Sequence, residues 1–277
     1  MVGIYSIYSP YSSYRSYSSY SSYSSYSPYK KNKTETMIQG IIFDYGGTLD
    51  TNGVHWAEVL WRQYETCGLP VAKADFREAY VHGERTMGKQ PLVQATDDFH
   101  QVLLIKSRLQ LQYLVDKGCL DAETYPTEMY ARRLADGGYA VAKEVVNNAR
   151  KVLQKVEKKY KMVLVSNFYG NIRTILEDFG LLCHFEEVIE SSVVGVRKPD
   201  PAIFSLGVEA MGFPAGEVVV VGDSYTKDIV PAHSLGCRTV WLKGIGWADE
   251  QADDSLPDFI IADLAELPNV IEEINKE

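Results

Sequence analysis

One stretch of the chain, residues 41–50, combines residue types that could bind and attack a small anion; its sequence is Ile41-Ile42-Phe43-Asp44-Tyr45-Gly46-Gly47-Thr48-Leu49-Asp50. A short apolar run that is stopped by glycine is typical of a buried strand in a parallel sheet. Asp44 then stands at the carboxyl end of this strand, where open α/β sheets bind their ligands. Gly46 and Gly47 let the backbone approach an anion closely, and Thr48 offers it a hydroxyl. The competing interpretation is an Asp-Gly turn that closes a core strand.

Two later apolar runs also end in polar residues. Residues 162–165 are followed by Ser166, and residues 218–221 are followed, after one glycine, by Asp223. Because the carboxyl ends of parallel strands lie along one edge of a sheet, we expect Ser166 and Asp223 to converge with Asp44. Each residue taken alone has a plainer explanation, since Ser and Asp are common caps at the start of helices. The prediction of a site therefore depends on the three strand ends meeting.

A third carboxylate joins this edge, because Asp228 lies in the first turn after Asp223 and can point back to it. Three carboxylates in one crevice repel one another, and a hard divalent cation with oxygen ligands relieves that repulsion. Mg²⁺ suits such a site, since it typically takes one or two carboxylates and keeps waters for a phosphate. Lys198 would supply further positive charge, although a lysine before a proline is also an ordinary surface residue. We therefore predict a Mg²⁺ site beside a phosphate group.

The elements that must position these residues fall into a helical block and an alternating block. Helical patterns follow the first strand, and Gly137-Gly138 is expected to end them; the predicted helices are 56–67, 76–87, 97–117 and one that begins near Pro126. A connection of this size is far longer than an ordinary link between a strand and the next helix. We expect an inserted all-helical domain over residues 53–139.

From residue 140 onward, helices and strands alternate, beginning with a helix over 141–159. The strands are predicted at 162–165, 187–190, 218–221, 239–242 and 259–261. Such alternation predicts an α/β fold with a doubly wound parallel sheet. The core would then be formed by residues 37–52 together with residues 140–277.

Residues 1–36 differ in composition from the rest, with a tyrosine at every third position from Tyr5 to Tyr29 and mostly serine between. We expect a disordered tail, because such a segment has no apolar face that could pack. Two explanations stand side by side: a tail that is sticky or phosphorylated, or a repeat that precedes a natural start at Met37. The second is the preferred hypothesis, since Met37 falls just before the first strand.

Composition excludes several other classes of function. A net charge of −9 and a pI near 5.2 argue against general binding to nucleic acid or to an anionic membrane. No apolar run approaches the length of about 20 residues that spans a bilayer, and the N-terminus has no apolar signal segment. The four cysteines form no CxxC pair and are predicted to be buried thiols; they are Cys67, Cys119, Cys183 and Cys237. This usage favours a reducing cytoplasm.

Taken together, four motifs resemble, in their order along the chain, those of the haloacid dehalogenase superfamily of hydrolases: Asp44-Tyr45-Gly46-Gly47-Thr48-Leu49, Ser166 after a strand, Lys198 before Pro199, and Gly222-Asp223 with Asp228. Each motif is weak alone, and the four in order are a specific combination. The resemblance covers about 37–52 and 140–277. It implies that the helical block is an α-helical cap inserted after the first motif.

The resemblance also implies roles for the residues. Asp44 would be a nucleophile that attacks phosphorus and forms an aspartyl-phosphate, which water then hydrolyses. Ser166 and Lys198 would hold the phosphoryl oxygens, and Lys198 would offset the charge of the transition state. The backbone amides of Asn167 and Tyr45 would add contacts to the substrate. The substrate would be a small phosphorylated metabolite.

The implied Mg²⁺ ligands are Asp44, Asp223 and the backbone carbonyl of Gly46, with Asp228 as a ligand or an orienting group. Position 46 is also where the sequence departs from the family, because its phosphatases usually carry there a second Asp that acts as general acid and base. Gly46 keeps the carbonyl and loses the proton donor. General acid catalysis is typically worth about 10² to 10⁴ in rate, so alkyl phosphates are expected to be slow substrates.

Three alternatives follow from the missing acid. Members of the family that lack this Asp include phosphonatases and dehalogenases, so the resemblance leaves both reactions open. Dehalogenases are the poorer match, because Gly222-Asp223 with Asp228 is the metal-binding form. It could also bind a phospholigand without turning it over. Finally, the helical domain could replace the acid with His82 or His100, although a lone histidine on a helix is usually structural.

Overall fold

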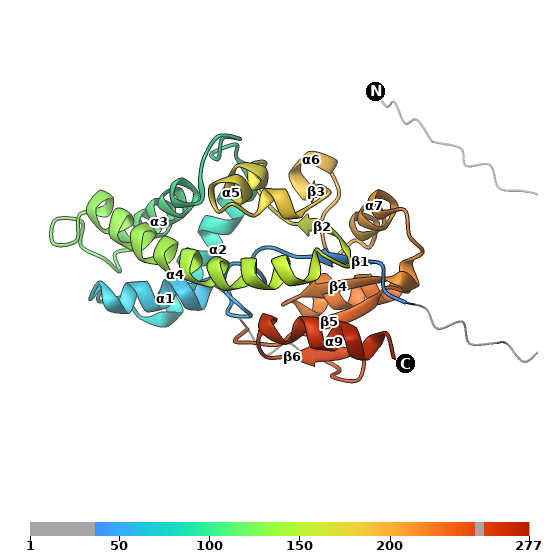
Figure 1. Cartoon of the computed structure of the whole chain (residues 1–277). Coiled ribbons are helices and arrows are strands. Elements are labelled where there is room, and N and C mark those ends of the chain that lie inside the picture. The colour runs from blue at the N-terminus through green and yellow to red at the C-terminus, as the bar shows by residue number, and fades with distance from the viewer. Residues whose placement is uncertain (1–36, 247–251, 277) are drawn as a thin grey trace, which may run out of the picture. The chain divides into compact units, whose positions relative to one another are not determined.

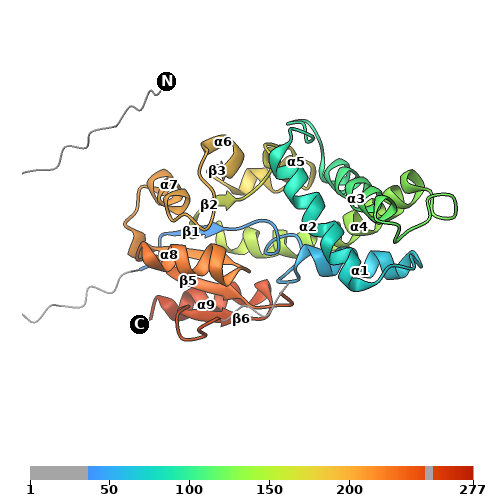
Figure 2. The same cartoon turned by 180° about the vertical axis from the view of Figure 1, so that it is seen from behind.

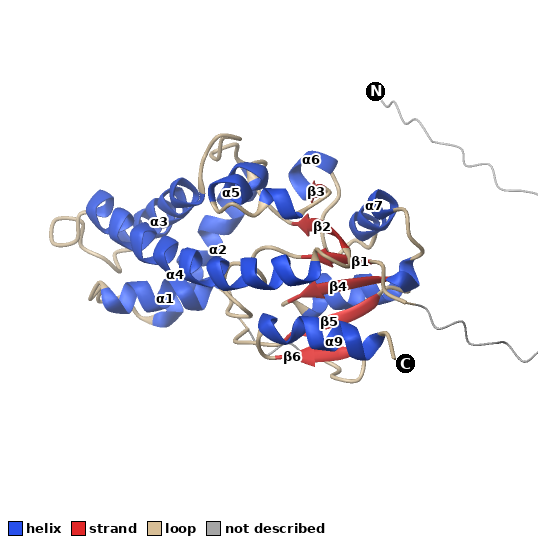
Figure 3. Cartoon of the chain, in the orientation of Figure 1, coloured by secondary structure: helices blue, strands red, loops and turns tan. Residues whose placement is uncertain are grey.

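A parallel sheet carries the predicted site residues. The computed structural model describes residues 37–246 and 252–276, so the prediction of a disordered tail over 1–36 lies outside the described residues. Within them the strands pair in the order β3-β2-β1-β4-β5-β6, all parallel (Figure 3). They are β1 (Gly40–Phe43), β2 (Lys161–Ser166), β3 (Glu187–Glu190), β4 (Val218–Gly222), β5 (Arg238–Leu242) and β6 (Phe259–Ile261). The predicted strands are confirmed.

Both faces of this sheet are buried, which explains the continuous apolar runs in its central strands. Every residue of β1 and β4 is buried. Because successive side chains point to opposite faces, Ile41 and Phe43 pack into one apolar cluster and Ile42 into another. Strands that are covered on both sides lose the alternation of polar and apolar residues that a half-exposed strand shows.

Helices cover the two faces. One face packs against α4 (Thr127–Val156), α5 (Ile172–Asp178) and α9 (Leu267–Ile274), and α4 and α9 lie in front of the sheet in Figure 1. The other face packs against α7 (Ala202–Met211) and α8 (Val230–Ser234), and Figure 2 shows α8 from that side. This confirms the doubly wound α/β fold. The short elements are η1 (Leu182–His184), α6 (Ser191–Val194), η2 (Ala215–Glu217), the π-helical turn η3 (Tyr225–Ile229) and η4 (Leu264–Glu266).

A helical segment is inserted between β1 and β2, as predicted. It contains α1 (Trp56–Thr66), α2 (Lys73–Lys89), α3 (Phe99–Asp116) and the first half of α4. His55 caps α1 by accepting a hydrogen bond from the backbone N–H of Ala57. Asp98 and Gln101 form a reciprocal capping box at the start of α3. These polar caps explain where two of the helices begin.

The predicted helix break at Gly137-Gly138 is wrong, because α4 runs without interruption through both glycines. A Cβ on Gly138 would lie 3.3 Å from Leu103 Cδ1 and 3.6 Å from Leu60 Cδ2, so the glycine permits close packing against α3 and α1. Glycine costs about 1 kcal/mol in a helix interior, and this tertiary packing outweighs it. The predicted domain boundary between residues 139 and 140 falls inside this helix, and the division into domains stays a prediction.

The four cysteines are free thiols. Cys237 is buried, and burial raises its pKa to about 11. The prediction of buried thiols is wrong for Cys183, which is exposed in η1, while Cys67 and Cys119 are half-buried. Among the described residues, no helix has the length and apolar character that crossing a bilayer requires.

Candidate active site

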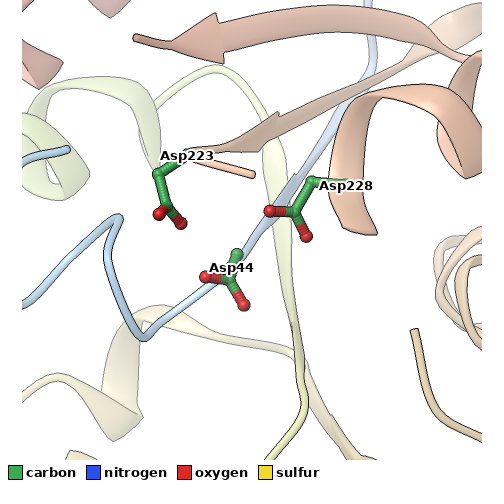
Figure 4. Close-up of side chains that lie close together, drawn as sticks. All are labelled: Asp44, Asp223 and Asp228. Atoms are coloured by element: carbon green, nitrogen blue, oxygen red, sulfur yellow. The ribbon is translucent and has the colours of Figure 1, made fainter. Parts of the chain in front are cut away.

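Three carboxylates meet at the carboxyl edge of the sheet, where β1 and β4 are neighbours. Asp44 directly follows β1, Asp223 directly follows β4, and Asp228 lies in η3. Each offers an oxygen that lies within 4.8 Å of the others, and Figure 4 shows the three carboxylates gathered around one point. Asp228 is held there because its Oδ2 accepts a hydrogen bond from the backbone N–H of Ser224 at 3.1 Å. The convergence predicted for Asp44, Asp223 and Asp228 is therefore present.

Lys198 lies against this cluster and is itself buried. Its Nζ donates to Asp44 Oδ1 at 2.6 Å and to Asp228 Oδ1 at 2.6 Å. Burial lowers the pKa of Lys198, but the carboxylates of Asp228 and Asp44 outweigh burial and raise it above the ordinary value. Lys198 is therefore an ammonium placed between two carboxylates.

One ammonium does not neutralise three carboxylates. Burial raises the pKa of Asp44 to about 6 against the opposing effect of Lys198. Burial, followed by the negative charges of Asp44 and Asp228, raises the pKa of Asp223 well above its ordinary value. Hard carboxylate oxygens that repel one another in a buried crevice are a donor set that Mg²⁺ fits. The residues present thus suit the predicted cation.

The glycine-rich loop after β1 is shaped by close contact with the cluster. Gly47 has φ +100°, and a Cβ there would lie 2.3 Å from Asp223 Oδ2, so any other residue would be strained and would displace the Asp223 carboxylate. At Gly46, by contrast, a Cβ would meet no atom within 4 Å. Thr48 Oγ1 lies 3.3 Å from Asp44 Oδ2 and 3.2 Å from Asp223 Oδ1, and it accepts from the N–H of Asp223. Thr48 thereby ties the ends of β1 and β4 together.

Ser166 and Asn167 lie at the same edge, where β2 ends. Ser166 is buried as the last residue of the strand. The Asn167 side chain accepts from the backbone N–H of Lys198 at 2.9 Å and donates to its carbonyl at 3.0 Å. Asn167 thus fixes the backbone that presents Lys198, a contact that sequence reasoning missed.

These residues surround a cavity of about 1470 Å³. Of the predicted site residues, it is lined by Asp44, Gly46, Ser166, Asn167, Lys198, Asp223 and Asp228. Thr48 and Tyr45 are not among its lining residues. The Tyr45 ring is buried and packs edge-on against Phe99 and Phe168. The structure thus brings seven of the predicted residues to one cavity, whereas Thr48 and Tyr45 do not line it.

A family model described as haloacid dehalogenase-like hydrolase matches residues 38–236. The chain belongs to the haloacid dehalogenase-like hydrolases. Haloacid dehalogenase-like hydrolase domain-containing protein 3 of Danio rerio is 43% identical over 108 residues, which cover 39% of this chain and 44% of that relative. Glyceraldehyde 3-phosphate phosphatase of Pyrococcus furiosus is 32% identical over 140 residues, which cover 47% of this chain and 55% of that relative. The matched stretch thus spans about half the length of each relative.

The fold agrees with this family. A crystal structure of a dehalogenase with an intermediate complex aligns with a TM-score of 0.58 at 18% identity, covering 84% of this chain and 96% of that one. At this identity the alignment supports the shared fold. The observed sheet and inserted helices therefore belong to a known hydrolase architecture.

The inserted helices of this hydrolase also contribute residues that line the cavity. His55, Tyr80, Lys106 and the core residue Tyr169 line the cavity, together with Glu84. Lys106 Nζ lies 2.6 Å from Glu84 Oε1, and the Tyr169 hydroxyl donates to Glu84 Oε2 at 2.8 Å. The helical segment and the core loop after β2 therefore meet at the cavity through the ion pair of buried Lys106 with half-buried Glu84 and the hydrogen bond from Tyr169.

Neither histidine that was considered as a replacement acid lies in this cavity. His82 stacks on Tyr113 and lines a separate groove, and His100 Nε2 pairs with Asp136 at 2.7 Å. The histidine that lines the cavity is His55. Its pKa is lowered to about 4, mainly by burial and next by the positive charge of Lys227. Its place just before the predicted helix was the signal that could have indicated a site residue. The sequence does not show, however, in which direction the side chain of a helix N-cap residue points.

Proposed function

We propose that this hydrolase is a Mg²⁺-dependent phosphatase that acts on a small phosphorylated metabolite through a covalent intermediate on Asp44. The observation that carries the proposal is the meeting of three carboxylates and one ammonium in a single cavity at the β1–β4 edge. A relative that is named as a phosphatase of a small phosphorylated compound adds support. Asp223 and Asp228 favour this reaction over dehalogenation, because a site of paired acids calls for a cation.

In the first step an oxygen of Asp44 attacks phosphorus, and the bond from phosphorus to the leaving oxygen breaks with its electron pair on that oxygen. The Lys198 ammonium and the Ser166 hydroxyl hold the phosphoryl oxygens and stabilise the charge that develops on them. In the second step water attacks the same phosphorus, which releases phosphate and restores the Asp44 carboxylate. Lys198 donates directly to Asp44, so the positive charge and the nucleophile lie side by side.

Asp44, Asp223, Asp228 and the carbonyl of Gly46 would hold Mg²⁺. When bound, the cation supplies positive charge to the phosphoryl group and offsets the repulsion among the carboxylates. Because Gly46 supplies no proton donor, the preferred substrates are acyl or aryl phosphates, whose leaving groups need little protonation. The helical segment over residues 53–139 acts as the cap that covers the cavity and sets specificity.

The test is turnover of p-nitrophenyl phosphate and acetyl phosphate with Mg²⁺, comparing the wild type with Asp44→Asn. We expect turnover in the wild type and its loss in Asp44→Asn, because the amide is not a nucleophile. Binding of Mg²⁺ and phosphate without turnover in the wild type would instead identify a phospholigand-binding protein. Chloride release from chloroacetate, with no phosphatase activity, would identify a dehalogenase.

A further inference from the structure

Asp50 is a buried carboxylate that lies beside the site and outside its cavity. It is fully buried and is not among the cavity-lining residues. Its Oδ1 accepts from the backbone N–H of Gly47 at 2.7 Å, and its Oδ2 accepts from Trp56 Nε1–H at 2.8 Å. Both oxygens are thus used by donors, so the contacts of Asp50 reach the site through the Gly47 amide and the Trp56 indole that it holds.

The Gly46–Gly47 peptide connects Asp50 to the carboxylate cluster. This peptide is trans, because the cis bond found among residues 37–246 and 252–276 joins Lys198 to Pro199. In a planar trans peptide the N–H and the preceding C=O point in opposite directions. Since Asp50 holds the N–H, the carbonyl of Gly46 is directed away from Asp50.

The far side of this peptide lies next to the cluster. Gly46 lines the cavity together with Asp44 and Asp223. The Gly47 backbone is so close to Asp223 that a Cβ would lie 2.3 Å from its Oδ2. The carbonyl of Gly47 accepts from the N–H of Gly53 at 2.7 Å, which fixes the next peptide as well. The loop is therefore held by Asp50 on one side and lies against the carboxylates on the other.

We propose that Asp50 is a positioning residue for the cation site: by holding the Gly47 amide, it keeps the Gly46 carbonyl turned toward the carboxylate cluster, where that carbonyl would be a cation ligand. The proposal rests on the proposed function, because the carbonyl is a ligand only if these carboxylates bind Mg²⁺. Two adjacent glycines have wide conformational freedom, so this loop needs an anchor outside its own side chains. Asp50 supplies that anchor.

The experiment measures Mg²⁺ binding to the full chain by isothermal titration calorimetry, with circular dichroism as the check of folding. Asp50→Ala removes both acceptors, and we expect the Mg²⁺ affinity to fall about 10- to 100-fold, as for other residues that orient metal ligands. Trp56→Phe is the matched control, since it removes the indole donor and leaves the Gly47 contact; its affinity should stay close to that of the wild type. The double variant Asp50→Asn/Trp56→Phe should bind Mg²⁺ more tightly than Asp50→Ala, because the Asn amide oxygen can still accept from the Gly47 N–H. Trp56→Phe removes the indole donor, which the Asn amide NH₂ could not accept.

The outcomes separate this proposal from the proposed function. A folded Asp50→Ala protein that binds Mg²⁺ as tightly as the wild type overturns the role of Asp50 alone. A wild-type chain that binds no Mg²⁺ overturns both. If Asp50→Ala does not fold, amide exchange in the wild type tests the proposal instead. The protein is labelled with ¹⁵N at its glycines, and we expect the Gly47 N–H to exchange slowly with solvent both with and without Mg²⁺. Rapid exchange of that amide contradicts the proposal.

Discussion

At the scale of single residues, position 46 offers the sharpest test of the chemistry. The carboxylates of Asp44 and Asp223 lie within reach of one cation, but position 46 carries no carboxylate. Gly46 is exposed to the cavity, and it is not among the residues with positive φ. A Cβ there meets no atom within 4 Å. The backbone and the space therefore accept a larger side chain.

We predict that Gly46→Asp raises kcat/KM on an alkyl phosphate by about 10²-fold or more, because it adds a general acid beside the leaving group. Activity on p-nitrophenyl phosphate should change little, since its leaving group needs no proton. Gly46→Asn is the matched control, with the same size and no transferable proton, and it should not raise the rate. Steady-state kinetics on both substrates checks this. Equal rates for the Asp and Asn variants would mean that the site obtains its acid elsewhere.

The sequence predicted the residues of the site where strand topology alone brings them together. Asp44, Ser166 and Asp223 each follow an apolar run, and parallel strands place such residues at one edge. The hydrogen bonds of Asp50 and Thr48 were not predicted. They form where a tight loop folds back on itself, and the spacing of residues along the sequence does not show how such a loop folds. His55 was missed for the same reason, since the direction of its side chain depends on how α1 meets the core.

At the scale of elements, α4 shows how packing overrides local propensity. The two glycines predicted a break, but α4 continues through them. Its neighbours α3 and α1 pack close to Gly138, where a side chain would be in the way. Gly137 differs, since a Cβ there would meet the flexible end of Gln63 rather than a packed helix. Propensity is a weak guide wherever a buried helix has many tertiary contacts. The strands, by contrast, were predicted well because burial on both faces leaves an unmistakable apolar run.

We predict that Gly137→Ala stabilises the protein by up to about 1 kcal/mol, the gain for removing glycine from a helix interior. Gly138→Ala should be less favourable than Gly137→Ala, because its Cβ would press on Leu103 at 3.3 Å. Urea denaturation followed by circular dichroism measures both free energies of unfolding. A larger gain for Gly138→Ala would contradict this account of α4.

At the scale of the whole molecule, the carboxylate cluster should link cation binding to stability. Asp44 is far in sequence from Asp223 and Asp228, and the repulsion among the three carboxylates opposes the folded arrangement that brings them together. A cation that binds the folded chain and not the unfolded one stabilises it by mass action, by about 2.7 kcal/mol at 100 times the dissociation constant.

We predict that saturating Mg²⁺ raises the Tm of the EDTA-treated protein by several degrees, at roughly 2–4 °C per kcal/mol for a chain of about this size. Asp223→Asn removes one ligand and should abolish most of the shift. Differential scanning calorimetry of both proteins, with and without Mg²⁺, gives the comparison. A full Mg²⁺ shift in Asp223→Asn would place the cation elsewhere.

The unbroken course of α4 has a mechanical consequence. Its first half packs with α3 and α1, while its second half contacts η4 and α9 and adds Val146, Ala149 and Val152 to the apolar cluster on this face of the sheet. Sharp bends in a helix occur at specific defects such as a proline, a bulge or a pair of small residues, and Gly137-Gly138 is a pair of this kind within α4. If the cap swings open to admit substrate, the bend within α4 belongs at this glycine pair, and the other connection flexes around Gly53, which has φ +86°.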